Sequence, residues 1–120
     1  MNSLKTARTE ALFAELAAEF INRESAGQSL ITVTSAHESN NGRLISILLT
    51  VLPNSREQAA LDFLSRKKRE FGAYVAERAK LRFLPSVEFV IDLGEKNRQR
   101  LDELSQQERE IGQRRSGEVG

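Results

Sequence analysis

Apolar side chains near the start of the chain recur every three or four residues, which is the spacing of one face of a helix. The repeat begins at residue 3 or 6 and ends at residue 22, while acidic residues lie elsewhere on the helical surface. This pattern predicts one amphipathic helix with a wide apolar face. A polar segment follows, residues 22–28, in which Gly27 is the expected stop or turn. The apolar positions are Leu12, Phe13, Leu16, Ala17, Phe20 and Ile21.

Two segments, residues 30–37 and 43–52, show the two-residue alternation and the β-branched composition of strands. In the first segment, Ala36 falls on the same side as the threonines. The second segment is apolar on both sides, which predicts a central, well covered strand. Residues 39–42, with the sequence Ser-Asn-Asn-Gly, tolerate positive φ angles, so the two strands are expected to form an antiparallel hairpin.

Residues 55–85 have the composition of a helix, which cannot continue past Pro85. One unbroken helix would place Lys67 and Arg78 inside its apolar stripe. A break at residues 70–72, Glu-Phe-Gly, removes this conflict, because glycine costs about 1 kcal/mol inside a helix and each half can then choose its own buried face. The first half is expected to bury Ala60, Leu61, Phe63 and Leu64, and the second half Tyr74, Val75 and Ala79.

Residues 86–92 alternate apolar and polar side chains and predict a third strand. Residues 95–111 have a helix-forming composition, and the last polar residues are expected to be disordered. The order of elements is therefore helix, strand, strand, broken helix pair, strand. This order indicates a single domain of the α+β class with a three-stranded sheet and a C-terminal helix or tail.

Composition limits the class of protein. The chain has 120 residues, a length that fits one domain with a core that needs no covalent cross-links. It has no cysteine, which excludes disulfides and thiolate metal sites. No apolar segment reaches transmembrane length, and the N-terminal residues lack the uninterrupted apolar core of a signal peptide. We therefore expect a monomeric cytoplasmic protein with no membrane partner.

Positive charge is concentrated in one part of the chain. Residues 56–84 contain eight basic and four acidic residues, a balance of +4 in a chain whose net charge is +1. RNA phosphates are bound by cations that project from a rigid element, so this charge predicts RNA binding, with a solvated helix face as the alternative. For Gly72, a structural role, to end one helix and permit the next, is preferred over a direct backbone contact with RNA. The candidate RNA-binding residues are Arg43, Arg66, Lys67, Lys68, Arg69, Gly72, Arg78, Lys80 and Arg82.

Candidate catalytic and metal-binding groups are few. His37 is the only histidine, has no cysteine to assist it, and is interpreted as a polar turn residue. No pair of acidic residues has a setting that would separate their pKa values, and nucleophile and phosphate-loop motifs are absent. We therefore expect no enzymatic activity, metal, cofactor or small-molecule substrate. Phe71 and Tyr74 could stack on bases, although their helical spacing favours core packing.

The run Leu81-Arg82-Phe83-Leu84-Pro85, followed by Glu88-Phe89 and Asp92, resembles the ribosome-binding factor A family. The likeness covers nearly the whole chain, residues 5–104. Members of that family are similar to type II KH domains, with a helical kink of the pattern Ala-x-Gly in place of the GxxG loop. The matching triplet is Glu70-Phe71-Gly72, in which the glycine agrees and the glutamate occupies the position of the alanine.

This resemblance implies a KH-like RNA-binding domain, residues 1–104, with the order α-β-β-α-kink-α-β, and a polar, partly disordered extension, residues 105–120. It also implies binding to ribosomal RNA near the decoding end of an immature small subunit, with release after maturation. The expected partners are small-subunit ribosomal RNA and the free small ribosomal subunit. Two other functions stay open: a general single-strand RNA-binding module of KH type, and a protein-interaction adaptor whose apolar first helix meets a partner.

Overall fold

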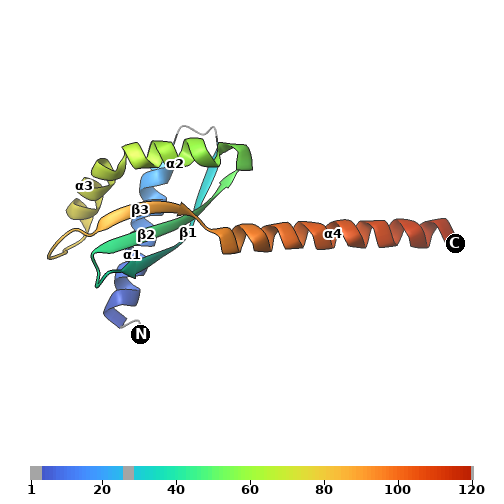
Figure 1. Cartoon of the computed structure of the whole chain (residues 1–120), viewed down its shortest axis with the longest axis horizontal. Helices are drawn as coiled ribbons and strands as arrows, with labels where there is room; N and C mark the ends of the chain where they lie inside the picture. Colours follow the sequence, from blue (N-terminus) through green and yellow to red (C-terminus); the bar gives the residue numbers. More distant parts are fainter. Residues whose placement is uncertain (1–3, 26–28, 120) are drawn as a thin grey trace.

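The computed structural model describes residues 4–25 and 29–119, with side chains as far as residue 106. The expected order of elements is confirmed, and with it the α+β, KH-like class (Figure 1). The expected turn at Gly27 lies outside the described residues. The elements are α1 (Leu4–Glu24), β1 (Leu30–Ser39), β2 (Leu44–Leu52), a short 3-10 helix (Asn54–Arg56), α2 (Glu57–Arg66), α3 (Lys68–Arg78), β3 (Ser86–Ile91) and α4 (Leu93–Val119).

The three strands form one mixed sheet in the order β1-β2-β3. β1 and β2 pair antiparallel, as predicted, and β2 pairs parallel with β3, so that β2 is central. The hairpin turn has positive φ angles at Asn40, Asn41 and Gly42, namely 51°, 55° and 83°. The Asn-Asn-Gly sequence is suited to this turn, because these residues tolerate left-handed backbone conformations better than most.

A bulge in β1 makes the predicted alternation of side chains wrong in the second half of this strand. The register with β2 shifts between Val33 and Ser35. The extra residue moves the following side chains to the other face of the strand. Ala36, which we placed with the threonines, is therefore buried in the core, and His37 lies on the outer face as an exposed residue.

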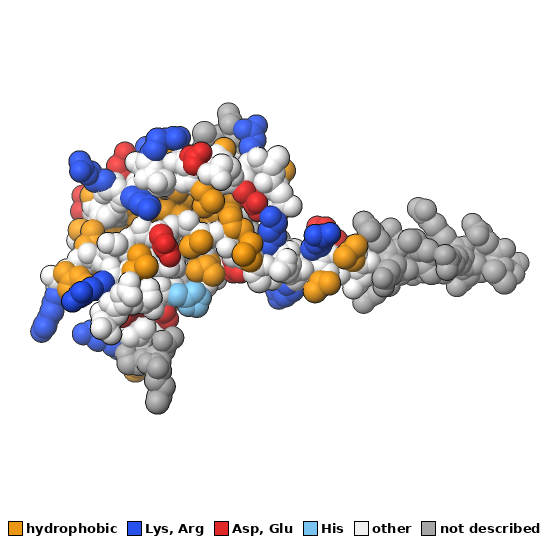
Figure 2. Space-filling view, viewed as in Figure 1, with side chains coloured by type: hydrophobic (Ala, Val, Ile, Leu, Met, Phe, Trp, Pro, Cys, Tyr) orange, Lys and Arg blue, Asp and Glu red, His pale blue; other side chains and the backbone are white. Residues whose placement is uncertain are grey.

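The helices cover one face of the sheet. α1 packs on β1 and β2, α2 on β2 and β3, and α3 contacts both α1 and β3 (Figure 1). No helix of the described residues covers the opposite face (Figure 1), and Leu52 and Val90 are 50% and 40% exposed. The prediction that β2 is well covered is thus correct for one face only. Figure 2 looks onto the uncovered face, where apolar side chains gather over the sheet.

The core contains the aromatic residues of the helices. Phe71 is fully buried and Tyr74 is 8% exposed, so both pack in the core, as the helical spacing predicted. The ring of Phe71 lies 5.3 Å from that of Phe20 and 5.8 Å from that of Phe89, measured between ring centroids. Aromatic pairs at such distances stabilise a core beyond the area that they bury. These contacts fix α3 against both α1 and the sheet.

The helix break lies at Lys67, and the prediction of a break at residues 70–72 is wrong. Lys67 has φ −98° and ψ 3° and separates α2 from α3, whereas Gly72 is a buried residue inside α3. Lys67 is one of the two cations that an unbroken helix would have placed in its apolar stripe, so the break relieves that conflict directly. A Cβ atom on Gly72 would lie 3.0 Å from Cδ2 of Leu84. The glycine therefore allows close packing of the chain that follows α3.

α4 leaves the domain at the end of β3 and extends away from it (Figure 1). Asp92 begins this helix, because its Oδ1 accepts a hydrogen bond of 3.0 Å from the backbone N–H of Glu95. Lys96 forms an ion pair of 2.9 Å with Glu57, which joins the base of α4 to the start of α2. The helix continues beyond residue 111, where the sequence predicted its end. The division into residues 1–104 and a partly disordered extension stays a prediction.

Candidate nucleic-acid interface

Apart from Arg43, the predicted RNA-binding cations lie on three connected segments. Arg66 ends α2, Lys68 and Arg69 begin α3, and the helix break at Lys67 lies between them. The other predicted residues are Gly72 and Arg78 in α3, Lys80 and Arg82 in the loop after α3, and Arg43 next to β2. Figure 2 shows basic side chains over α2 and α3 and at the end of the molecule formed by the following loop.

Cations at the helix break point into solvent. Arg66, Lys68 and Arg69 are exposed, and none of them forms an ion pair or side-chain hydrogen bond with another described residue. Lys68 and Arg69 also occupy the first turn of α3, where the helix dipole is positive and no side chain caps the helix. Cations at this end do not stabilise the helix, but together with the helix N-terminus they attract an anion. This arrangement suits a phosphate group.

Lys67 and Arg78 are more restrained than their neighbours. Nζ of Lys67 lies 3.3 Å from a carboxylate oxygen of Glu70 and 5.8 Å from the ring centroid of Phe63. The guanidinium carbon of Arg78 lies 3.6 Å from the ring centroid of Tyr74, and its Nη1 donates a hydrogen bond of 3.2 Å to the Tyr74 carbonyl. These contacts hold both cations near the domain surface, so each has less freedom to reach a phosphate.

Gly72 has a packing role in the structure. It is buried inside α3 with Leu84 packed against it, so the expectation that Gly72 ends one helix and permits the next is wrong. A direct contact between its backbone and RNA stays a prediction.

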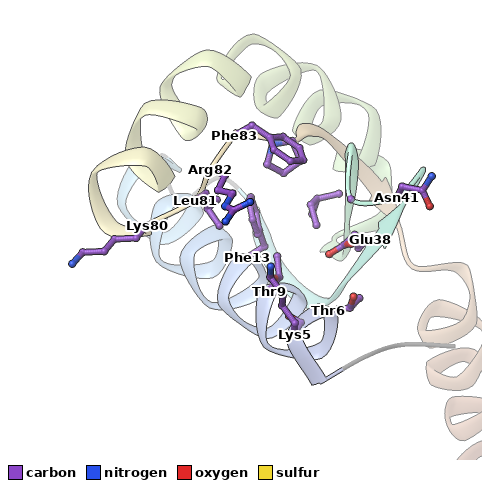
Figure 3. Close-up of a pocket in the computed structure, with 13 residues that line it drawn as sticks. Lys5, Thr6, Thr9, Phe13, Glu38, Asn41, Lys80, Leu81, Arg82 and Phe83 are labelled. Atoms are coloured by element: carbon purple, nitrogen blue, oxygen red, sulfur yellow. The ribbon is translucent and has the colours of Figure 1, made fainter.

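A second group of cations lies where the loop after α3 meets the first turns of α1. Here a pocket of about 480 Å³ is lined by both segments and by the β1–β2 hairpin (Figure 3). Among its lining residues are Lys5, Glu38 and Phe83, which sequence reasoning did not select as site residues. The run around Phe83 carried the family resemblance, but only the fold shows that residues near positions 5, 38 and 83 converge.

Asp92, at the base of α4, is a carboxylate with a shifted pKa. A hydrogen bond from the Thr34 hydroxyl, 2.5 Å to Oδ2, and the amide of Glu95 hold the pKa of Asp92 below its ordinary value. Because both donors favour the charged carboxylate, Asp92 stays ionised at neutral pH. The base of α4 thus carries a negative charge at neutral pH.

The described residues offer neither a metal site nor a membrane-spanning helix. No group of three or more His, Asp or Glu side chains there could hold a metal ion. The same residues contain no helix that is both long and apolar enough to cross a membrane.

The comparisons with known proteins agree on one family. The family model described as ribosome-binding factor A matches residues 5–105. The crystal structure of ribosome-binding factor A from Thermus thermophilus is 31% identical, with a TM-score of 0.65 over 72% of this chain and 93% of that chain. No curated protein matches significantly.

Two further solved structures are similar. A Thermus thermophilus ribosome-binding factor A homology model, fitted into a cryo-EM map of a 30S complex with that factor, is 31% identical, with a TM-score of 0.58 over 66% of this chain and 86% of that chain. The solution structure of a Thermotoga maritima protein, described as a putative ribosome binding factor A, is 22% identical, with a TM-score of 0.61 over 74% of this chain and 89% of that chain. The likeness to the Thermotoga maritima protein supports the fold alone.

Proposed function

Because this chain belongs to the ribosome-binding factor A family, we propose that it binds small-subunit ribosomal RNA and assists maturation of the small ribosomal subunit. The family model covers the whole sheet and the three helices that pack on it. The related Thermus thermophilus protein has been fitted into a map of a 30S complex. The free small subunit is therefore the partner of this chain.

The unpaired cations at the helix break are the observation that carries this proposal. Arg66, Lys68 and Arg69 project from two helices that are fixed to the sheet by buried residues on both sides of the break. Side chains held in this way reach phosphates with little loss of backbone entropy on binding. Because the helix break lies between Arg66 and Lys68, the three side chains project in more than one direction. The phosphates along the curved backbone of a folded RNA also point in more than one direction.

Binding energy is the means by which such a protein assists maturation. A protein shifts an RNA equilibrium only as far as it binds one conformer better than the other. The rigid α2–α3 surface fits one arrangement of the RNA backbone and stabilises that arrangement in the immature particle. The protein acts in the cytoplasm as a monomer, and no catalytic step is required of it.

Removal of the two free cations that begin α3 tests this function. We expect Lys68→Ala with Arg69→Ala to weaken binding to free small subunits about tenfold or more while the fold is kept. The slope of log K against log salt should become less steep by about 1.4, because two single-strand phosphate contacts are lost. Binding is measured by sedimentation at several salt concentrations.

The matched control removes two cations from α4, Arg98 and Arg100, which lie away from the helix break. This control should bind as the wild type does. Equal affinity of the Lys68/Arg69 variant and the control would overturn the proposed interface. Equal association of the wild type with mature ribosomes or any single-stranded RNA would favour a general RNA-binding module.

A further inference from the structure

The pocket beside α1 contains charges of both signs that do not neutralise each other. Lys5 from α1, Glu38 from β1 and Arg82 from the loop after α3 all line it. None of these three side chains forms an ion pair or hydrogen bond with another residue whose side chain the structure describes. Figure 3 shows Arg82 and Glu38 on opposite sides of the space, whereas Lys80 extends away from it. A ligand that fills the pocket must therefore carry both a negative group and hydrogen-bond donors.

An aromatic side chain stands at the same pocket. Phe83 is 60% exposed, while Phe13, which also lines the pocket, is fully buried and closes its floor. An exposed ring beside cations on a loop is the arrangement with which proteins stack unpaired bases. The volume, about 480 Å³, lies in the usual range for small-ligand sites.

We propose that this pocket takes one unpaired nucleotide of an RNA strand, with the base on Phe83, its amino edge at Glu38 and its phosphate at Arg82 and Lys5. The proposal rests on the RNA-binding function above and deepens it. It adds a site that is separate from the cations at the helix break. An acidic peptide fits less well, because Glu38 would face like charges and Phe83 would have no flat partner.

Glu38 gives the site a base preference. A carboxylate accepts hydrogen bonds and cannot donate them, so it pairs with the exocyclic amino groups of cytosine, adenine and guanine. Uracil presents carbonyl oxygens at the corresponding positions, which a carboxylate repels. The wild type should therefore bind short oligocytidylate and oligoadenylate about tenfold more tightly than oligouridylate, as the loss of a charged hydrogen bond predicts.

Stacking is tested by Phe83→Ala in the full chain, with fluorescence anisotropy of labelled short oligocytidylate as the readout. Affinity should fall about tenfold, within the range of one base–aromatic stack. Phe83→Leu keeps an apolar side chain without the ring and should lose nearly as much. The control is Leu101→Ala, because Leu101 is 64% exposed on α4 and its truncation removes a similar exposed apolar group. Equal affinity of Phe83→Ala and Leu101→Ala would overturn the proposal.

The base preference is tested by Glu38→Gln. Glutamine both donates and accepts, so the difference between oligocytidylate and oligouridylate should nearly disappear without loss of the fold. A wild type that binds all three oligonucleotides equally would overturn the pocket assignment. So would cytidine monophosphate that competes as strongly as oligocytidylate, since the pocket would then be a site for free nucleotides.

The two proposals fail separately. Loss of small-subunit binding in the Lys68/Arg69 variant, together with no effect of Phe83→Ala or Glu38→Gln on RNA, removes the pocket assignment alone. A wild type that binds neither small subunits nor any RNA removes both.

Discussion

Tyr74 shows how a single residue joins the core to the basic surface. Its ring packs against Phe20 at 5.4 Å between centroids, and Arg78 lies 3.6 Å from the ring centroid. Its hydroxyl donates a hydrogen bond of 3.1 Å to Glu19 on α1. The residue therefore holds α3 to α1, and it also sets the position of a cation at the end of α3.

Tyr74→Phe should reduce the free energy of unfolding by about 1 kcal/mol, because one hydrogen bond is lost and the exposed Glu19 can turn to water. RNA affinity should not change, since the ring that Arg78 covers remains. Tyr74→Leu removes the ring as well and should cost at least about 1 kcal/mol more. Urea unfolding of the three proteins measures this, and equal losses for both variants would contradict the role of the ring.

Helices and strands were largely predictable, because each element buries a periodic apolar face. Two details did not follow from this periodicity: the position of the break in the helix pair and the bulge in β1. At the break in the helix pair, exclusion of Lys67 from the core outweighed the cost of about 1 kcal/mol for Gly72 inside a helix. In β1, nothing in the threonine-rich sequence marks the bulge that turns Ala36 inward.

The part of the candidate site that lies within one short segment of the chain was predictable from the sequence. The run of residues 66–69 is visible in the sequence, whereas Lys5, Glu38 and Phe83 come from three separate segments. Only the pairing of the hairpin and the packing of α1 bring these segments together.

Asp92 is the residue on which the start of α4 depends. Asp92→Ala should cost about 1 kcal/mol, the usual value for the loss of a helix N-cap. The pKa of Asp92 is lowered in the folded protein, so its charge stabilises the fold above its ordinary pKa of 3.8. This contribution is lost as the pH falls through the lower pKa of the folded state.

Thermal unfolding from neutral to acidic pH measures this dependence. The difference in stability between wild type and Asp92→Asn should be constant near neutral pH and should shrink at acidic pH. A difference that grows on acidification would show that the sign of the pKa change is wrong.

The whole molecule consists of a packed domain and a helix that projects from it, with overall extents of 69 × 36 × 20 Å. Among the side chains that the structure describes, the buried ones all precede residue 104, as do the cations proposed to bind RNA. Folding and RNA binding are thus expected to depend on the domain and not on the extension after residue 104.

A chain that ends at residue 104 should therefore fold and bind RNA as the full chain does. Its stability should lie within about 0.5 kcal/mol of that of the full chain, the range typical of surface changes. Circular dichroism and the oligocytidylate assay measure the two properties. A large loss of either would show that the C-terminal part of α4 takes part in the fold or in the RNA contact.

The missing side chain of Gly72 has a consequence for the shape of the RNA that this protein accepts. Cδ2 of Leu84 lies only 3.0 Å from the place where a methyl group would be, so the loop with Arg82 and Phe83 sits close against α3. The cations that begin α3 and those at the pocket are thereby kept at a set separation. A strand that touches both must match that spacing, and the protein selects its target by length along the backbone as well as by charge.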